Sequence, residues 1–439
     1  MKHFLKKLFL CVAVCTVNIY ADRQSSEITL QFPAGAENTG LGECGVSLAN
    51  TAFTVFWNPA NVACLYEETY LNNSYSQFHE ALLPKFTFPD LYHDFSVFST
   101  TINNALPNVD IGYAYFRNFI NFGTSNFYDS TGVFLDSINA DETVTGSCFG
   151  LRAFDIISIG FTLKNYNSRL APRINQPTYP RDGISTGSAY DIGLRLNKKF
   201  EDISGLFYMN PALGISVLNF AGDSAKYIDT SSSKDPLPKT GFWGTSIEFN
   251  ALDIIGYTFV FEEEYNLLSA PYEQTIHRGQ KFQLTPFYAI LRGSMDDYAG
   301  QRFEYTEGYV ISFNLQQTFA MTSKIVKAID LLYESNYFAG FNKKYNSCLT
   351  IAGFVFRPNV YYSKSHCVIF GKYADAVREG QTRDDWSIGI GIVAQFPNYC
   401  NIKDFTNTTT TTGQPVGVKP VVPNKNPAIT EEDAAEVVE

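Results

Sequence analysis

Charged residues are scarce in this chain of 439 residues, since Asp, Glu, Lys and Arg together make up 18% of it. A soluble domain typically has about 25%. Basic residues are the scarcer kind, with 33 Lys and Arg against 44 Asp and Glu and a net charge of −11. Because phosphate contacts need clustered Lys and Arg, the absence of a basic run argues against binding to nucleic acid.

Long hydrophobic runs are also missing. After the N-terminal region no segment reaches 18 uninterrupted apolar residues, and the best one, Ala251 to Phe261, is broken by Asp253. A helix needs about 20 such residues to span a bilayer. We therefore expect no transmembrane helix.

The N-terminus is typical of an export signal. Three lysines precede an apolar stretch from Leu8 to Tyr20, and Ala21 supplies a small residue before the expected cleavage site. Residues 1–21 are therefore predicted to be a signal peptide. A lipoprotein cut before Cys15 is the alternative, although the residues before it match a lipobox poorly.

Cysteine and histidine are too few and too scattered to predict a metal site. Two of the eight cysteines fall within the signal, no CxxC spacing occurs, and four histidines remain after cleavage. We predict no metal and no cofactor. Six cysteines in an oxidising compartment allow disulfides, and Cys44 with Cys64 is the expected pair.

What the sequence does contain is period-two alternation, combined with 15% aromatic residues. In the run from Ile157 to Lys164, four apolar side chains share one face and small or polar residues occupy the other. The runs 191–197 and 386–396 repeat this pattern. An alternation of this kind predicts β-strands.

About fourteen such strands are predicted, near residues 67–78, 92–103, 107–118, 147–154, 155–166, 188–197, 208–220, 241–250, 251–264, 281–292, 308–319, 328–338, 346–357 and 384–396. One or two soluble β-sandwiches would need a bulky inner face. A membrane barrel instead has strands of about 10 residues, apolar outside and polar inside. Because Gly, Ser, Thr and Asn crowd the second face, we favour an all-β, transmembrane antiparallel barrel.

Two segments flank the predicted barrel, which covers residues 67–396. Residues 22–66 are rich in Gly, Ala and Asn and are predicted to form a plug or lid. Residues 397–439 contain a threonine run, several prolines and an acidic end. This composition predicts a disordered tail, which we place in the periplasm.

A barrel of this kind has short turns at one end and long loops at the other. Long loops are predicted at 119–146, 167–187, 221–240, 265–280 and 358–383. The stretch 293–307 does not fit the alternation, which indicates a miscounted strand between 251 and 330. Candidate contacts for a partner are the aromatic residues of the first loop: Phe119, Phe122, Phe127, Tyr128 and Phe134.

Motifs that resemble enzyme signatures lack the context that the chemistry needs. The GxGxxG pattern at 40–45 has no hydrophobic strand before it, so we assign its glycines to backbone turns. The GxSxG pattern at 183–187 has no strand leading in and no helix leading out. The acidic run 262–264 is interpreted as a solvated rim, with a cation site as the alternative. No enzyme is predicted.

Residues 38–65 (NTGLGECGVSLANTAFTVFWNPANVACL) resemble the N-terminal signature of the PorV/PorQ branch of the FadL-like outer-membrane proteins. The residues that carry this resemblance are Gly40, Gly42, Gly45, Trp57, Asn58, Pro59 and Ala60. Weaker matches follow in order at 189–193, 212–220, 237–244 and 302–308.

This resemblance implies a 14-stranded barrel in the bacterial outer membrane, in contact with its lipid. PorV-like members imply a non-enzymatic role in type IX secretion, with translocon and cargo or surface-attachment proteins as partners. FadL-like members imply uptake of long-chain fatty acids or another hydrophobic ligand. We predict the secretion role, with hydrophobic transport as the alternative and a porin-like barrel as a third possibility.

Overall fold

The computed structural model describes residues 26–32, 34–65, 71–82, 90–128, 131–170, 183–202, 205–227, 234–252, 254–268, 273–285, 288–297, 303–314, 325, 349–351, 354–371 and 382–395. Three predicted features lie outside these residues: the signal peptide 1–21, the strand 328–338 and the tail 397–439.

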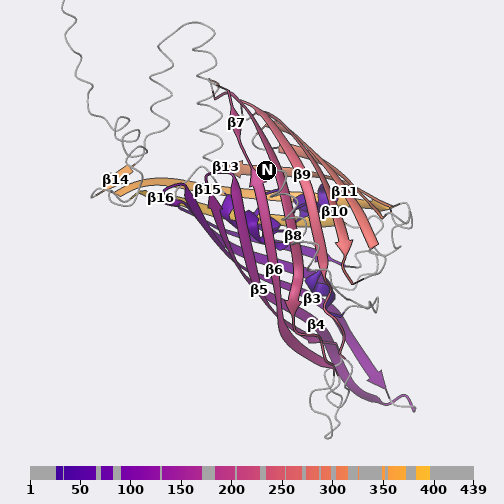
Figure 1. Cartoon of the computed structure of the whole chain (residues 1–439). Coiled ribbons are helices and arrows are strands. Elements are labelled where there is room, and N and C mark those ends of the chain that lie inside the picture. Colours follow the sequence, from indigo (N-terminus) through magenta and orange to yellow (C-terminus); the bar gives the residue numbers. More distant parts are fainter. Residues whose placement is uncertain are drawn as a thin grey trace, which may run out of the picture.

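The described strands form one antiparallel sheet that closes on itself (Figure 1). The strands are β1 Leu71–Ala81, β2 Leu91–Leu106, β3 Val109–Tyr128, β4 Phe134–Ala153, β5 Ile157–Arg169, β6 Ile184–Asn197, β7 Phe200–Glu201, β8 Phe207–Gly222, β9 Thr240–Ala251, β10 Ile255–Asn266, β11 Glu273–Thr285, β12 Tyr288–Asp297, β13 Phe303–Asn314, β14 Leu349–Ile351, β15 Phe354–Gly371 and β16 Thr382–Gln395. Short helices precede them: η1 Ile28–Leu30, α2 Ala36–Gly40, η2 Ala52–Phe56 and η3 Pro59–Cys64.

The ring closes through two pairings between distant parts of the chain. β1 pairs with β16, and β13 pairs with β15. Within the described residues β7 pairs with β8 alone and β14 with β15 alone, so fourteen of the sixteen strands make the ring. The predicted all-β barrel of about fourteen strands is therefore confirmed.

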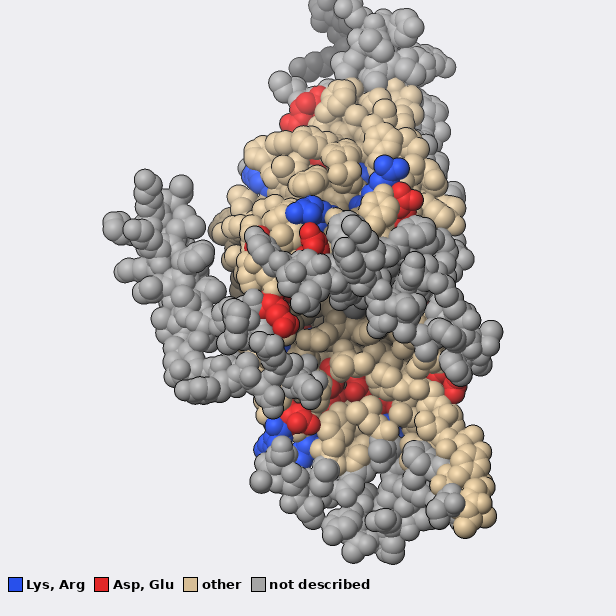
Figure 2. Space-filling model, turned by 90° about the vertical axis from the view of Figure 1, so that its right-hand side faces the viewer, with Lys and Arg blue, Asp and Glu red and all other residues tan. Residues whose placement is uncertain are grey.

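Burial along β5 shows which face of the sheet is which. Ile157, Ile159 and Leu163 are exposed on the outside, whereas Ser158 and Thr162 are buried inside. This pattern is opposite to that of a soluble sandwich, which buries its apolar face, and it is the pattern of a barrel surrounded by lipid. In Figure 2 charged side chains form small separate groups among uncharged ones on the face that is shown.

No helix among the described residues is long and apolar enough to cross a membrane.

Three predicted loops are largely strand: 119–146, 265–280 and 358–383. The loop 265–280 is wrong except in its middle, because β10 runs to Asn266 and β11 begins at Glu273. β3 runs to Tyr128 and β4 begins at Phe134, so the predicted loop 119–146 is wrong for most of its length. The main-chain pairing continues where polar residues on both faces have ended the apolar alternation. The predicted loop 358–383 is wrong up to Gly371, because β15 continues through polar residues and through Pro358.

The miscounted strand between 251 and 330 can be located. The predicted strand 281–292 is divided between β11 and β12, and Pro286 lies in the gap between them. Proline has no backbone N–H to donate, so it is disfavoured in a strand that pairs on both sides, although β15 accommodates Pro358. With this division, short connections after β2, β4, β9 and β11 all fall at one end of the barrel, which we call the turn end. The opposite end is the loop end.

Candidate functional site

Residues 26–65 lie inside the barrel, and we call this segment the plug (Figure 1, indigo). Most of its apolar side chains are buried almost completely, with Leu30, Val46 and Val62 at most 1% exposed, whereas Ile28 near its start is 43% exposed. Polar and backbone contacts reach strands all around the ring, from β4 to β13. The lumen of the described barrel is therefore occupied by the chain's own N-terminal segment.

Glycines of the wall allow the main chain of the plug to approach the sheet. Four of them lie opposite one another on successive strands: Gly112 of β3, Gly150 of β4, Gly160 of β5 and Gly193 of β6. A Cβ at Gly160 would overlap the backbone of Pro59, and one at Gly193 would overlap the side chain of Asn58. A larger residue would therefore displace the plug.

Two further glycines, on the opposite side of the ring, also allow the main chain of the plug to approach the sheet. Gly279 of β11 lies opposite Gly293 of β12, and a Cβ on either would overlap the backbone of Leu41 or Gly42. Gly42 itself has a φ of +76°, which other residues rarely adopt. Position 42 of the GxGxxG pattern therefore favours glycine for two reasons: its backbone conformation, and the close approach of the plug to the wall at this point.

One carboxylate of the wall binds the main chain of the plug. Glu262 of β10 accepts the N–H groups of Gly45 at 2.8 Å and Val46 at 3.0 Å on one oxygen. Its other oxygen accepts the N–H and the hydroxyl of Ser47, both at 3.0 Å. Four donors thus surround a carboxylate that is 1% exposed.

The interpretation of residues 262–264 as a solvated rim is wrong for Glu262. Strand alternation turns Glu262 inward, while Glu263 accepts a hydrogen bond from the indole of Trp243 at 2.8 Å. Glu264 lies 3.2 Å from Nε2 of His277. A sequence shows the same acidic run whether or not hydrogen-bond donors surround its carboxylates. The contact between Glu262 and the plug therefore could not be predicted from residues 262–264 alone.

Asn58 ties three parts of the molecule together. Its Oδ1 accepts the N–H of Ala60 at 3.0 Å and caps η3, in which Pro59 takes the first position. Its Nδ2 donates to the carbonyl of Val46 at 2.9 Å and to that of Leu194 in the wall at 3.1 Å. The Asn-Pro-Ala stretch is therefore a joint between the plug and β6.

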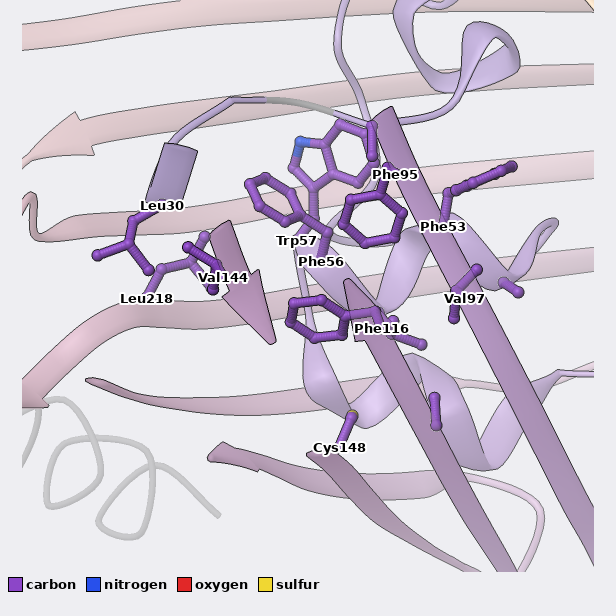
Figure 3. Close-up of a cluster of buried hydrophobic side chains, with 14 of the residues drawn as sticks. Leu30, Phe53, Phe56, Trp57, Phe95, Val97, Phe116, Val144, Cys148 and Leu218 are labelled. Carbon is purple, nitrogen blue, oxygen red and sulfur yellow. The ribbon is translucent and has the colours of Figure 1, made fainter. Parts of the chain in front are cut away.

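Aromatic side chains from the plug and the wall meet inside the lumen (Figure 3). The ring of Phe95 on β2 lies 5.9 Å from Phe53 and 6.1 Å from Phe56 of the plug. It also stacks on Phe116 of β3 at 5.3 Å. Trp57 contacts Phe56 edge to face at 5.4 Å. This group, which we call the aromatic cluster, makes one side of the lumen apolar.

A buried ion pair joins the motif segments that lie far apart in the sequence. Lys164 Nζ of β5 lies 2.7 Å from Asp191 and 3.2 Å from Asn219 Oδ1. Asn219, at a φ of +53°, donates its N–H to Asp191 and its side-chain amide to the carbonyl of Pro238, both at 2.8 Å. The segments 189–193, 212–220 and 237–244 therefore meet at Lys164, which sequence reasoning did not single out.

Cys44 and Cys64 are free thiols in the structure, so the predicted disulfide is not formed. Cys64 Sγ lies 3.0 Å from the hydroxyl of Ser158 in β5. Cys44 belongs instead to a separate apolar cluster with Leu41 and Val260. The two residues occupy different packing environments within the plug, which nearness in sequence does not reveal.

The predicted partner-binding aromatics do not form one surface. β3 pairs with β2 up to Phe122, and β4 pairs with β5 from Asp141. Residues 124–128 and 134–139 therefore form a two-stranded ribbon beyond the rest of the wall, which we call the ribbon 124–139. Tyr128 and Phe134 are exposed at its tip, with their rings 5.8 Å apart. Phe119 lies within the barrel wall. Phe122 is half-buried where the β2 pairing ends, and the side chain of Phe127 is outside the described set.

No protein-family model matches the sequence, and no curated protein matches it. The fold is similar to several solved structures. The toluene transporter TbuX of Ralstonia pickettii is 9% identical, with 82% of this chain and 98% of that chain covered and a TM-score of 0.36. The monoaromatic hydrocarbon channel CymD is 9% identical, with 82% and 97% covered and a TM-score of 0.39. A Pseudomonas aeruginosa FadL homologue is 8% identical, with 82% and 97% covered and a TM-score of 0.36. Similarity at this level assigns no family, and the barrel is established by the chain's own strand pairing.

Proposed function

We propose that this protein is a bacterial outer-membrane barrel that transports hydrophobic small molecules past its plug. The observation that carries this proposal is the aromatic cluster inside the lumen. A porin-like channel holds water in a polar lumen. Here Phe56 of the plug and Phe95 of the wall contact each other. A hydrophobic molecule that enters between plug and wall would contact these apolar side chains in place of their contact with each other.

The outer surface supports the membrane location. Large apolar side chains are exposed on successive strands of the wall, among them Ile111, Tyr115, Phe149, Leu151, Ile159 and Ile192. A soluble monomer rarely exposes apolar patches larger than a few hundred Å². A belt of this kind around a closed barrel is suited to lipid.

Uptake measurements test the transport proposal. We expect cells that express the full chain, and lack other barrels for hydrophobic compounds, to take up labelled oleate or toluene in a saturable way. Phe95→Ala should lower uptake at low substrate concentration by about 10-fold, because it removes part of the apolar contact. Phe98→Ala on the outer face of the same strand is the matched control, since Phe98 is 42% exposed. Folded wild-type barrel without saturable uptake would contradict the proposal.

The ribbon 124–139 supports a second candidate function, the binding of a protein partner. Exposed Tyr128 and Phe134 at its tip, together with Val133 at 59% exposure, form an apolar surface away from the outer belt. Aromatic residues are enriched in protein interfaces. Type IX secretion partners, as implied by the resemblance to PorV and PorQ, remain a prediction for this surface.

A further inference from the structure

Two carboxylates are buried where the plug begins. Glu27 precedes η1 and Glu142 lies on β4, and each residue is 2% exposed. Within the part of the chain that the structure describes, no Lys, Arg or His forms a salt bridge with either one. Burying a carboxylate without a counter-ion is costly unless it carries a proton or accepts strong hydrogen bonds.

Two hydroxyl groups connect these carboxylates. Oε1 of Glu142 lies 3.1 Å from Oγ of Ser168 on β5. The hydroxyl of Tyr227, in the connection between β8 and β9, lies 2.9 Å from Oγ of Ser168 and 2.8 Å from Oε1 of Glu27. The result is an unbroken row of oxygens, which we call the acid chain. The other oxygen of Glu142 accepts the N–H and the hydroxyl of Thr29, at 3.1 and 2.7 Å.

The acid chain contains one hydrogen fewer than its contacts require. Three oxygen–oxygen contacts need three hydrogens, and each hydroxyl supplies one. Ser168 donates to Glu142, and Tyr227 can donate to Ser168 or to Glu27 but not to both. A proton on one carboxyl group completes the row. With that proton on Glu27, the order of donation runs from Glu27 to Tyr227, to Ser168 and then to Glu142.

We propose that the acid chain binds one proton at neutral pH, and that loss of this proton releases the first turn of the plug, residues 26–31, from the wall. Without the proton two buried carboxylates repel each other and one contact lacks a hydrogen. Glu27 also sits at a φ of +61°, a conformation that a non-glycine residue keeps only where its surroundings hold it. The start of the plug is therefore fastened by a titratable contact.

Burial, followed by the charge of Glu142, raises the pKa of Glu27 to about 8, against smaller opposing effects of hydrogen bonds to Tyr227 and Ser185. Among the described residues, the other titratable or charged groups near the acid chain are Tyr166 of β5, Asp223 after β8 and Lys226 beside Tyr227. Arg169 is more distant, in an exposed pair with Asp141. Burial also raises the pKa of the Tyr227 phenol, so it stays protonated and keeps its single hydrogen.

Because the pKa of Glu27 is raised in the folded protein, its proton stabilises the first turn of the plug at low pH and not at high pH. An unfolded glutamate ionises near pH 4.5, whereas Glu27 in the plug holds its proton up to about pH 8. The stabilisation is present in full below about pH 4.5 and is lost as the pH rises from there to about 8. Alkaline conditions should therefore loosen the first turn.

Hydrogen exchange of the full-length protein in detergent tests this proposal. We expect the protection of residues 26–31, corrected for intrinsic exchange, to fall about tenfold or more between about pH 6 and about pH 9. Infrared spectroscopy should show the C=O band of a protonated carboxyl group at the lower pH and its loss at the higher one. Equal protection at both values, or no such band, would overturn the proposal.

Two substitutions supply the missing hydrogen without a titratable proton. In Glu27→Gln the amide N–H can donate to Tyr227, and in Glu142→Gln it can donate to Ser168 and reverse the row. Each should make the protection of residues 26–31 independent of pH. The control is Glu37→Gln, since Glu37 is also a buried carboxylate of the plug but pairs with Lys281 at 2.7 Å. A pH dependence that survives both substitutions would assign it to another group.

Discussion

At the level of single residues, the plug is held in place by polar atoms that would be costly to bury without a hydrogen-bond partner. Asn58, Glu262 and Arg195 each bind backbone groups of the plug from within or across the lumen, and the Arg195 Nε–H donates to the carbonyl of Ser47 at 3.1 Å. Each such group is expensive to leave unpaired, by about 1–3 kcal/mol. The position of the plug is therefore specified by a small number of contacts.

Glu262→Gln should weaken the docking of residues 45–47 by about 1–3 kcal/mol, because an amide N–H would then face backbone donors. Hydrogen exchange of this segment measures the effect. Glu263→Gln is the matched control, since Glu263 interacts with Trp243 and Tyr265 and not with the plug. Similar exchange in both variants would show that Glu262 does not anchor the plug.

Gly160→Ala should displace the plug from β5, because the added Cβ would overlap the backbone of Pro59. Gly241→Ala serves as the comparison, since its Cβ would find its nearest neighbour, Leu267, at an ordinary 3.4 Å. Alkylation of Cys64, buried beside Ser158, reports displacement in denaturant-free detergent. We expect rapid alkylation in Gly160→Ala and slow alkylation in Gly241→Ala. The same slow rate in both would mean that the glycine row tolerates side chains.

The sequence indicates these residues only in part. Glycine spacing and the Asn-Pro-Ala stretch mark Gly42 and Asn58 as special backbone positions, and the structure gives each a steric or capping role. Glu262, Lys164 and Glu27 carry no such mark. Their importance depends on partners that lie between 27 and 217 residues away in the chain, and a single sequence does not record such pairings.

At the level of elements, β3 and β4 are each 20 residues long and extend beyond their neighbours. Alternation predicts a strand where one face meets lipid and the other the lumen, and it ends where both faces meet water. Alternation therefore predicts a loop where the structure has the ribbon 124–139. The run 281–292 is the converse case, since its apolar alternation predicts one strand where the structure has the end of β11 and the start of β12.

Replacing residues 124–139 with a two-residue Asn-Gly turn should leave the barrel intact, because this segment pairs only with itself among the described strands. The shift in gel mobility between unheated and boiled samples checks that the barrel is folded. If the ribbon binds a partner, co-purification from outer membranes should be lost in this variant. Retention of the same partners would exclude the ribbon as their binding site.

At the level of the whole molecule, a closed ring surrounds a segment of its own chain. Removing the plug, residues 26–65, should convert the barrel into an open channel, because its inward wall is lined with small and polar residues such as Ser74, Ser158 and Thr162. Planar bilayer recordings measure this change. We expect steady conductance from the shortened chain and little from the full chain. Equal conductance of both would show that the plug does not close the lumen.

The opposed contacts of the plug have a mechanical consequence. Pro59 touches β5 on one side of the ring, while Gly42 touches β12 on the other. A hollow cylinder of fourteen strands can flatten into an ellipse without breaking any strand pairing, and an internal brace that spans it prevents this deformation. Any loosening of the brace would therefore allow the cross-section of the cylinder to change, so that motion inside the protein would be transmitted to the lipid around it.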